Sequence, residues 1–201
     1  MIKPSQTTSS DLWLNAAYAV LVEEGVDAVK IMTLAKRTGL TRTGFYWHFK
    51  DLNGLLDTLI QQWEETNTGN LVSRAAAPAQ SISEAMLNVF DCWHDETLFD
   101  APFDLAIRNW ARKDATLQAR LNQADARRIA ALCDMFNRYD YPVEQAKVRS
   151  MTVIYTQIGY ISMQVLDDLE QRLARVPQYV EVFTGVAPSA SEMQTFCARH
   201  R

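Results

Sequence analysis

One glycine between two short helix patterns constrains this chain more than any other feature of its sequence. The stretch before it, residues 33–38, opens on a threonine and continues with apolar residues at positions 34 and 35. Gly39 stands where that helix has to end, because glycine adopts the left-handed backbone conformation at little cost. Thr41 follows two residues later and is predicted to cap a second helix over residues 41–48. The spacing therefore predicts a helix-turn-helix.

The second helix of this motif is predicted to bury one aromatic face. Phe45 and Phe49 are four residues apart, so they share a face, which we expect to lie against the protein core. The remaining arc is polar, basic and aromatic, which is typical of a surface that lies in a DNA groove. With two residues of the first helix, the residues expected to contact DNA are Thr33, Lys36, Arg42, Thr43, Gly44, Tyr46, Trp47, His48 and Lys50.

The side chains on this arc suit different parts of a duplex. The guanidinium of Arg42 can pair with a guanine edge through two hydrogen bonds. Gly44 has no side chain, which lets the helix approach a partner closely. Tyr46, His48 and Lys50 can donate to phosphates, and such contacts fix the register on DNA without reading its sequence. A surface helix whose aromatic residues pack on a neighbouring element is the alternative.

With the helix before it, this stretch resembles the DNA-binding domain of the tetracycline-repressor (TetR) family. The resemblance runs from about Asp11 to about Leu59 and is strongest at the sequence Phe-Tyr-Trp-His-Phe-Lys, residues 45–50. It implies that two of these residues, Tyr46 and His48, hold phosphates. The residues that it places opposite bases are Arg42, Thr43, Gly44 and Trp47. The chain departs from the family pattern at Met32 and Leu52, where many members carry basic residues.

Composition predicts an all-α chain with two domains. The 201 residues include few glycines and prolines, and no run of β-branched residues alternates strictly with polar ones. Residues 1–50 are predicted to form a three-helix DNA-binding domain that starts with a polar tail at residues 1–9. A helix over 51–74 is expected to act as connector, and residues 75–201 to form a helical ligand-binding and dimerisation bundle. Other helices are expected at 10–24, 82–96, 102–112, 114–138, 142–168, 178–184 and 189–199.

The charge of the chain is distributed unevenly. Its formal net charge is −4, but residues 1–50 sum to +2 and residues 51–201 to −6. A basic surface attracts phosphate and an acidic one repels it, so only the N-terminal part is expected to meet DNA. Because the excess of +2 is modest, one copy alone is expected to bind DNA weakly.

The helix predicted at 142–168 has apolar residues on more than one face, and a helix that buries two faces needs two partners. One partner would be its own domain and the other the same helix in a second copy. The alternative is a central helix of a monomeric bundle. In a homodimer the two recognition helices would lie about 34–36 Å apart, or a multiple of this, on a palindromic operator. The residues expected at the dimer interface are Thr152, Tyr155, Gly159, Ser162 and Met163.

A set of large apolar residues in the second domain suggests either a pocket or plain core. The family resemblance implies a pocket for a small-molecule effector of unknown identity. The residues expected to line it are Met86, Phe90, Trp93, His94, Phe103, Trp110, Met151 and Tyr155.

The sequence gives no support for catalysis. It has three histidines and a single Asp91-x-x-His94 pair, which is too few ligands for a di-metal oxidase. It also lacks a glycine-rich phosphate loop. We therefore expect no catalytic residues, no metal and no cofactor. The polar start and the lack of a long apolar run predict a cytoplasmic protein that does not enter a membrane.

The sequence therefore predicts a DNA-binding transcriptional regulator, with repression taken from the family resemblance. Release from DNA by a small molecule is expected on the same basis. The alternative is a protein-interaction regulator with weak or no sequence-specific DNA binding.

Overall fold

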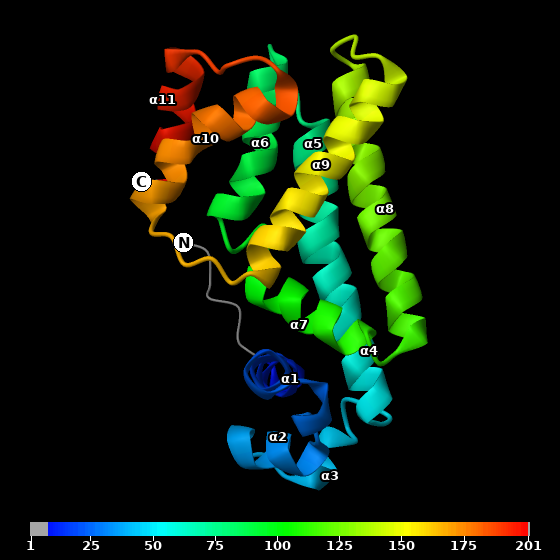
Figure 1. Ribbon diagram of the computed structural model, residues 1–201. Helices are drawn as coiled ribbons and strands as arrows, with labels where there is room; N and C mark the ends of the chain where they lie inside the picture. The colour runs from blue at the N-terminus through cyan, green and yellow to red at the C-terminus, as the bar shows by residue number, and fades with distance from the viewer. Residues whose placement is uncertain (1–7, 201) are drawn as a thin grey trace. The chain divides into compact units, whose positions relative to one another are not determined.

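The structure of the chain is a computed structural model that describes residues 8–200, so most of the predicted polar tail lies outside the described residues. Every regular element in residues 8–200 is a helix (Figure 1), which confirms the all-α prediction. The chain forms two compact units. Unit 1 comprises Met1–Trp63 and Pro102–Leu117, and unit 2 comprises Glu64–Ala101 and Gln118–Arg201. These bounds differ from the predicted domains at residues 1–50 and 75–201. The predicted connector helix over 51–74 is divided between the units, and residues 102–117 belong to unit 1.

Unit 1 is built around the N-terminal helices. In Figure 1, α2 and α3 lie side by side, and α2 lies against α1. The elements of unit 1 are α1 (Ser9–Glu24), a 3₁₀ turn (Val26–Ala28), α2 (Ile31–Thr38), α3 (Arg42–Phe45), α4 (Leu52–Trp63) and α7 (Ala101–Ala111).

A capping box begins α1. The Thr8 hydroxyl accepts from the Asp11 backbone N–H at 3.2 Å, and the Asp11 carboxylate accepts from the Thr8 N–H at 2.8 Å. These bonds satisfy backbone donors at the helix start, and they lower the pKa of Asp11. The helix expected over residues 10–24 therefore begins one residue earlier, at Ser9.

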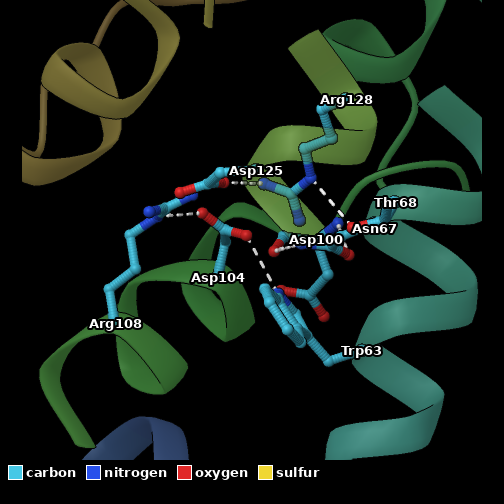
Figure 2. A network of polar contacts seen from close by, with 8 residues as sticks. All are labelled: Trp63, Asn67, Thr68, Asp100, Asp104, Arg108, Asp125 and Arg128. Atoms are coloured by element: carbon cyan, nitrogen blue, oxygen red, sulfur yellow. Dashed lines mark hydrogen bonds and ion pairs between the residues drawn. The ribbon is translucent and has the colours of Figure 1, made fainter. Parts of the chain in front are cut away.

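A buried carboxylate ties α7 into unit 1 (Figure 2). The Trp63 indole Nε1 donates to Asp104 Oδ1 at 2.9 Å, and Arg108 Nε donates to Asp104 Oδ2 at 2.7 Å. Asp104 is fully buried, so its charge needs these donors. The Tyr18 and Phe103 rings meet edge to face, with centroids 5.1 Å apart. Together these contacts attach α7 to α4 and α1.

Unit 2 is a bundle of longer helices. In Figure 1, α10 and α11 lie beside α6. Its elements are a π-helical turn (Glu64–Gly69), α5 (Asn70–Ala76), α6 (Ile82–His94), α8 (Ala115–Asn137), α9 (Val143–Ser162), α10 (Leu169–Thr184) and α11 (Ala190–Arg199).

The π-helical turn interrupts the helix predicted at 51–74. Its buried Asn67 exchanges two hydrogen bonds with the backbone of Asp100, at 2.8 and 3.0 Å. The next side chain, Thr68, accepts from Arg128 Nε at 2.9 Å, and Arg128 also meets Asp125 at 3.4 Å (Figure 2). A widened turn of this kind is invisible to a pattern based on 3.6 residues per turn.

A second buried carboxylate, Asp91 on α6, fixes the C-terminal end of the chain. Its Oδ1 accepts from His200 Nε2 at 2.8 Å and from Arg199 NH2 at 3.0 Å, while Arg74 lies 3.4 Å from Oδ2. Because Asp91 is almost completely buried, its charge requires these partners. Three segments that are distant in sequence therefore meet at one side chain.

The last third of the chain departs most from the predicted helices. A helix was expected only from residue 178, but α10 begins at Leu169 with a capping box of Asp168 and Gln171, and Pro177 lies inside it. The helix tolerates the proline because Val176 and Val180 are buried on either side of it. Helix α9 ends at Ser162, six residues earlier than predicted, and Gln164 has a positive φ of 51°.

Within residues 8–200, no helix combines the length and apolar character that crossing a bilayer would require.

Candidate nucleic-acid interface and ligand cavity

The turn between α2 and α3 forms as the sequence predicts. Gly39 ends α2 with a φ of 73° and a ψ of 8°, which is left-handed geometry. The Thr41 hydroxyl accepts from the Gly44 N–H at 3.1 Å and so caps α3. The Thr38 hydroxyl donates to the Leu34 carbonyl at 2.9 Å and accepts from the Leu40 N–H at 3.2 Å. The helix predicted at residues 33–38 begins two residues earlier, at Ile31, so Thr33 lies within α2.

The aromatic face of the motif is buried as predicted. Phe45 and Trp13 are both 0% exposed, and their rings meet edge to face with centroids 5.3 Å apart. Phe49 is also buried, 5.4 Å from Phe45 between centroids. Leu34 of α2 is fully buried. The α-helical part of α3 is shorter than predicted, since it ends at Phe45 and continues as a turn over residues 46–48.

Burial of Phe45 leaves its neighbours facing outward. The Trp47 side chain is 83% exposed, and Tyr46 is 48% exposed. Of the nine residues predicted to contact DNA, Thr33 and Gly44 are half-buried. The exposed ones are Lys36, Arg42, Thr43, Tyr46, Trp47, His48 and Lys50.

Two arginines in this region, Arg42 and Arg37, have different partners within the protein. The Arg42 guanidinium lies over the Tyr46 ring, with its carbon 6.0 Å from the centroid, and NH2 is 3.5 Å from the Tyr46 hydroxyl. Arg37 instead pairs with Glu23 at 2.7 Å, and this hydrogen bond lowers the pKa of Glu23. The charge of Arg37 is therefore matched within the protein.

Packing within the chain does not require a glycine at position 44. A Cβ built there would meet only the Thr41 hydroxyl oxygen, at 3.4 Å, and the backbone is helical. The missing side chain instead leaves an open place on the helix between Arg42 and Trp47. Such a place permits close approach by another molecule.

Unit 2 contains a cavity among α6, α9 and α10. Its empty volume, including its open mouth, is about 560 Å³. Three of the eight residues predicted to line a pocket lie on it, namely Phe90, Trp93 and His94. Phe103 and Trp110 belong to α7 in unit 1, and the other predicted residues that do not line this cavity are Met86, Met151 and Tyr155.

Helix α10 also lines this cavity, which was not expected from the sequence. Val176, Tyr179 and Phe183 of α10 line it at spacings of three and four residues. That spacing is typical of a helical face, but it crosses Pro177, and the predicted helix began only at residue 178. Arg172, one turn before Val176, also lines the cavity.

Two polar atoms on the cavity-lining turn of α6 are buried and unpaired, namely Trp93 Nε1 and His94 Nε2. His94 Nδ1 donates to the Phe90 carbonyl at 3.0 Å, so the unpaired Nε2 is an acceptor. Burial lowers the pKa of His94 to about 4, which leaves the imidazole neutral at pH 7.

Burial also makes one of the three free cysteines a poor redox sensor. Cys92 is fully buried, and the loss of solvent raises its pKa to about 12. A thiol in this state is almost entirely protonated at pH 7 and therefore unreactive.

Comparison with known proteins shows which family the N-terminal region resembles. Residues 14–59 match the family model described as bacterial regulatory proteins, tetR family. The helix-turn-helix region of the chain is therefore similar to that of TetR-family regulators. The chain is 31% identical over 85 residues to the HTH-type transcriptional regulator AcrR of Shigella flexneri. It is 37% identical over 62 residues to the tetracycline repressor protein class A from transposon 1721 of Escherichia coli.

Sequence similarity to these curated relatives covers only part of each protein. The alignments span 39% and 31% of this chain, and 38% and 29% of the lengths of AcrR and the tetracycline repressor. The family model covers residues 14–59, in the N-terminal part of the chain.

Solved structures show that the likeness in fold extends over nearly the whole chain. The ketosteroid transcriptional regulator KstR2 of Mycobacterium tuberculosis has a TM-score of 0.67 at 14% identity, covering 94% of this chain and 98% of that one. The fatty acid degradation regulator FadR of Bacillus halodurans has a TM-score of 0.65 at 15% identity, covering 92% and 97%. At such identities the comparison shows the fold alone. It confirms a helix-turn-helix domain followed by a helical C-terminal domain.

The opposite environments of Phe45 and Trp47 lead to a prediction about stability. Phe45→Ala should lower the free energy of unfolding by about 3–5 kcal/mol, because it leaves a cavity beside Trp13. The matched variant Trp47→Ala should change it by less than about 0.5 kcal/mol, since the indole is solvent-exposed. Urea unfolding of the full chain measures both. A Trp47→Ala variant as unstable as Phe45→Ala would mean that the indole packs in the protein.

Proposed function

We propose that this chain is a dimeric transcriptional repressor that binds a palindromic operator and is released by a small-molecule ligand. The observation that carries the proposal is the pairing of a fully buried Phe45 with a Trp47 that is 83% exposed. Exposing an indole to water is unfavourable unless a partner covers it. A basic and aromatic surface around it favours double-stranded DNA as that partner.

In this proposal the residues of α3 read bases. Arg42 pairs with a guanine edge, and Trp47 and Thr43 lie against thymine methyl groups. Gly44 permits the close approach. Tyr46, His48 and Lys50 hold phosphates, and the exposed Lys36 on α2 does so from the preceding helix, beside Thr33.

Exposed apolar residues on α9 support a homodimer. Val148, Tyr155 and Met163 are 61%, 53% and 77% exposed. Their spacing of seven and eight residues places them along one face of the helix. Soluble monomers rarely leave a continuous apolar stripe in water. The proposed interface is the part of this face formed by Thr152, Tyr155, Gly159, Ser162 and Met163.

The cavity of unit 2 supports a small-molecule effector. It lies among three helices, and its lining combines aromatic side chains with a few polar and charged groups, which is common for ligand sites. A ligand releases DNA only to the extent that it binds the non-binding conformation of the dimer more tightly than the DNA-binding one.

A gel-shift experiment tests DNA binding and the roles of two cations. The wild-type protein should prefer DNA from upstream of its own gene to random duplex, with a steep loss of affinity in salt. Arg42→Ala should reduce that preference at a cost of about 1–3 kcal/mol. The matched variant Lys50→Ala should weaken binding to both DNAs about equally.

Two results would contradict this assignment. If Arg42→Ala weakens both DNAs as evenly as Lys50→Ala does, Arg42 does not read bases. If the wild-type protein shows no preference at any salt concentration, the repressor proposal fails and a protein-interaction regulator takes its place.

Sedimentation tests whether the protein forms a dimer through the proposed α9 interface. Tyr155→Glu should weaken self-association at least about tenfold, because burying an unpaired carboxylate at the interface is costly. Ala130→Glu places the same charge on an exposed position of α8 and should leave the dimer intact. A wild-type protein that sediments as a monomer at micromolar concentration would contradict the proposed interface, as would equal behaviour of the two variants.

A further inference from the structure

The cavity in unit 2 is lined by flat aromatic side chains from three helices. The Phe90 and Trp93 rings of α6 have centroids 5.0 Å apart and are nearly perpendicular. On α10, Tyr179 and Phe183 are stacked, with centroids 5.7 Å apart and an interplanar angle of 27°. Tyr160 contributes a ring from α9. Walls of this kind suit a planar aromatic ligand, because rings pack well face to face and edge to face.

Three charged side chains line the same cavity, and two of them neutralise each other. Arg175 NH1 lies 2.6 Å from Asp167 Oδ2, which also accepts from the Tyr160 hydroxyl at 3.1 Å. The carboxylate of Asp167 is therefore matched by a cation and by a hydrogen-bond donor. Neither Asp167 nor Arg175 leaves an unbalanced charge at the cavity.

The third charged side chain, Arg172, has no such counter-ion. Its NH2 donates to the backbone carbonyl of Trp93, which carries no charge. Among residues 8–200, no carboxylate lies within 4.0 Å of its guanidinium. A guanidinium has five N–H donors, so several stay available for a ligand. The half-buried Arg172 thus leaves one uncompensated positive charge in an aromatic site.

The nearby polar atoms do not offset this charge. His94 is neutral at pH 7 and presents an unpaired acceptor, and Trp93 presents an unpaired indole donor. A cationic ligand would be repelled by Arg172. A neutral ligand would cover the guanidinium and remove its water without supplying a counter-ion.

We propose that this cavity binds a planar aromatic monocarboxylate of one or two rings, with its carboxylate on Arg172 and its rings among Phe90, Trp93 and Tyr179. The inference rests on the proposed function, because it names the chemical class of the effector. Arginine holds a carboxylate through two parallel N–H···O bonds, which fix the orientation of the ligand. The paired rings of α6 and α10 offer flat surfaces for a compact ring system.

Calorimetry with three probes of one ring system tests the charge preference. The probes are 2-naphthoate, 2-naphthamide and 2-naphthylmethylammonium, which carry charges of −1, 0 and +1. The full-length wild-type protein should bind the naphthoate about tenfold more tightly than the amide, because a charge-assisted pair is stronger than a neutral one. The ammonium probe should bind most weakly.

Variants of Arg172 test whether this residue causes the preference for the acid over the amide. Arg172→Gln should reduce the ratio of acid to amide affinity to about one, and the binding of the amide that remains shows that the variant is folded. Arg172→Lys should retain part of the preference, since it keeps a point charge without the planar fork. Arg127→Gln removes an exposed arginine of α8 that does not line the cavity, and it should behave as wild type.

Gel shifts of the same protein without probe separate this inference from the proposed function. If wild-type protein binds the amide as tightly as the acid, or binds none of the probes while still binding its operator, the inference is overturned and the repressor proposal stands. If naphthoate binds with the expected preference but no operator is bound, the ligand class is supported and the repressor proposal fails. An Arg172→Gln variant that keeps the acid preference would overturn the role of Arg172.

Discussion

The burial of Phe45 against Trp13 is the contact on which the exposed surface of α3 depends. Both rings are fully buried, and Phe49 extends the same cluster. Because Phe45 is fixed at the C-terminal end of α3, the residues around it cannot also face inward. Arg42 and Trp47 lie exposed for that reason. The Gly39 turn and the Thr41 cap set the direction of α3, so these few contacts determine what the unit presents to a partner.

In unit 2, helix α6 connects the buried polar contacts to the cavity. Helix α6 carries the buried Asp91, which ties Arg199 and His200 at the end of the chain to Arg74. Two residues further on, the same helix presents Trp93 to the cavity. The Trp93 carbonyl also accepts from Arg172 of α10. The position of Arg172 therefore depends on the packing of α6, α10 and α11, and this packing is fixed by buried polar contacts as well as by aromatic rings.

Local signals were enough to predict the helix-turn-helix, but not the cavity. Gly39, Thr41 and the Phe45 and Phe49 pair act within one or two turns, so their effects are readable from spacing. Pro177 misled the prediction because tertiary burial of Val176 and Val180 outweighs the local cost of a proline inside α10. The π-helical turn at Glu64–Gly69 depends on partners far along the chain, Asp100 and Arg128, which no local pattern reveals.

Hydroxyl-radical footprinting on DNA from upstream of the gene would show whether the short helix anchored by Phe45 enters the major groove, once from each copy of a dimer. We expect two protected patches on one face of the duplex, centred about one helical turn apart or a multiple of it. Even cleavage along the DNA, at protein concentrations where the duplex is fully bound, would contradict it.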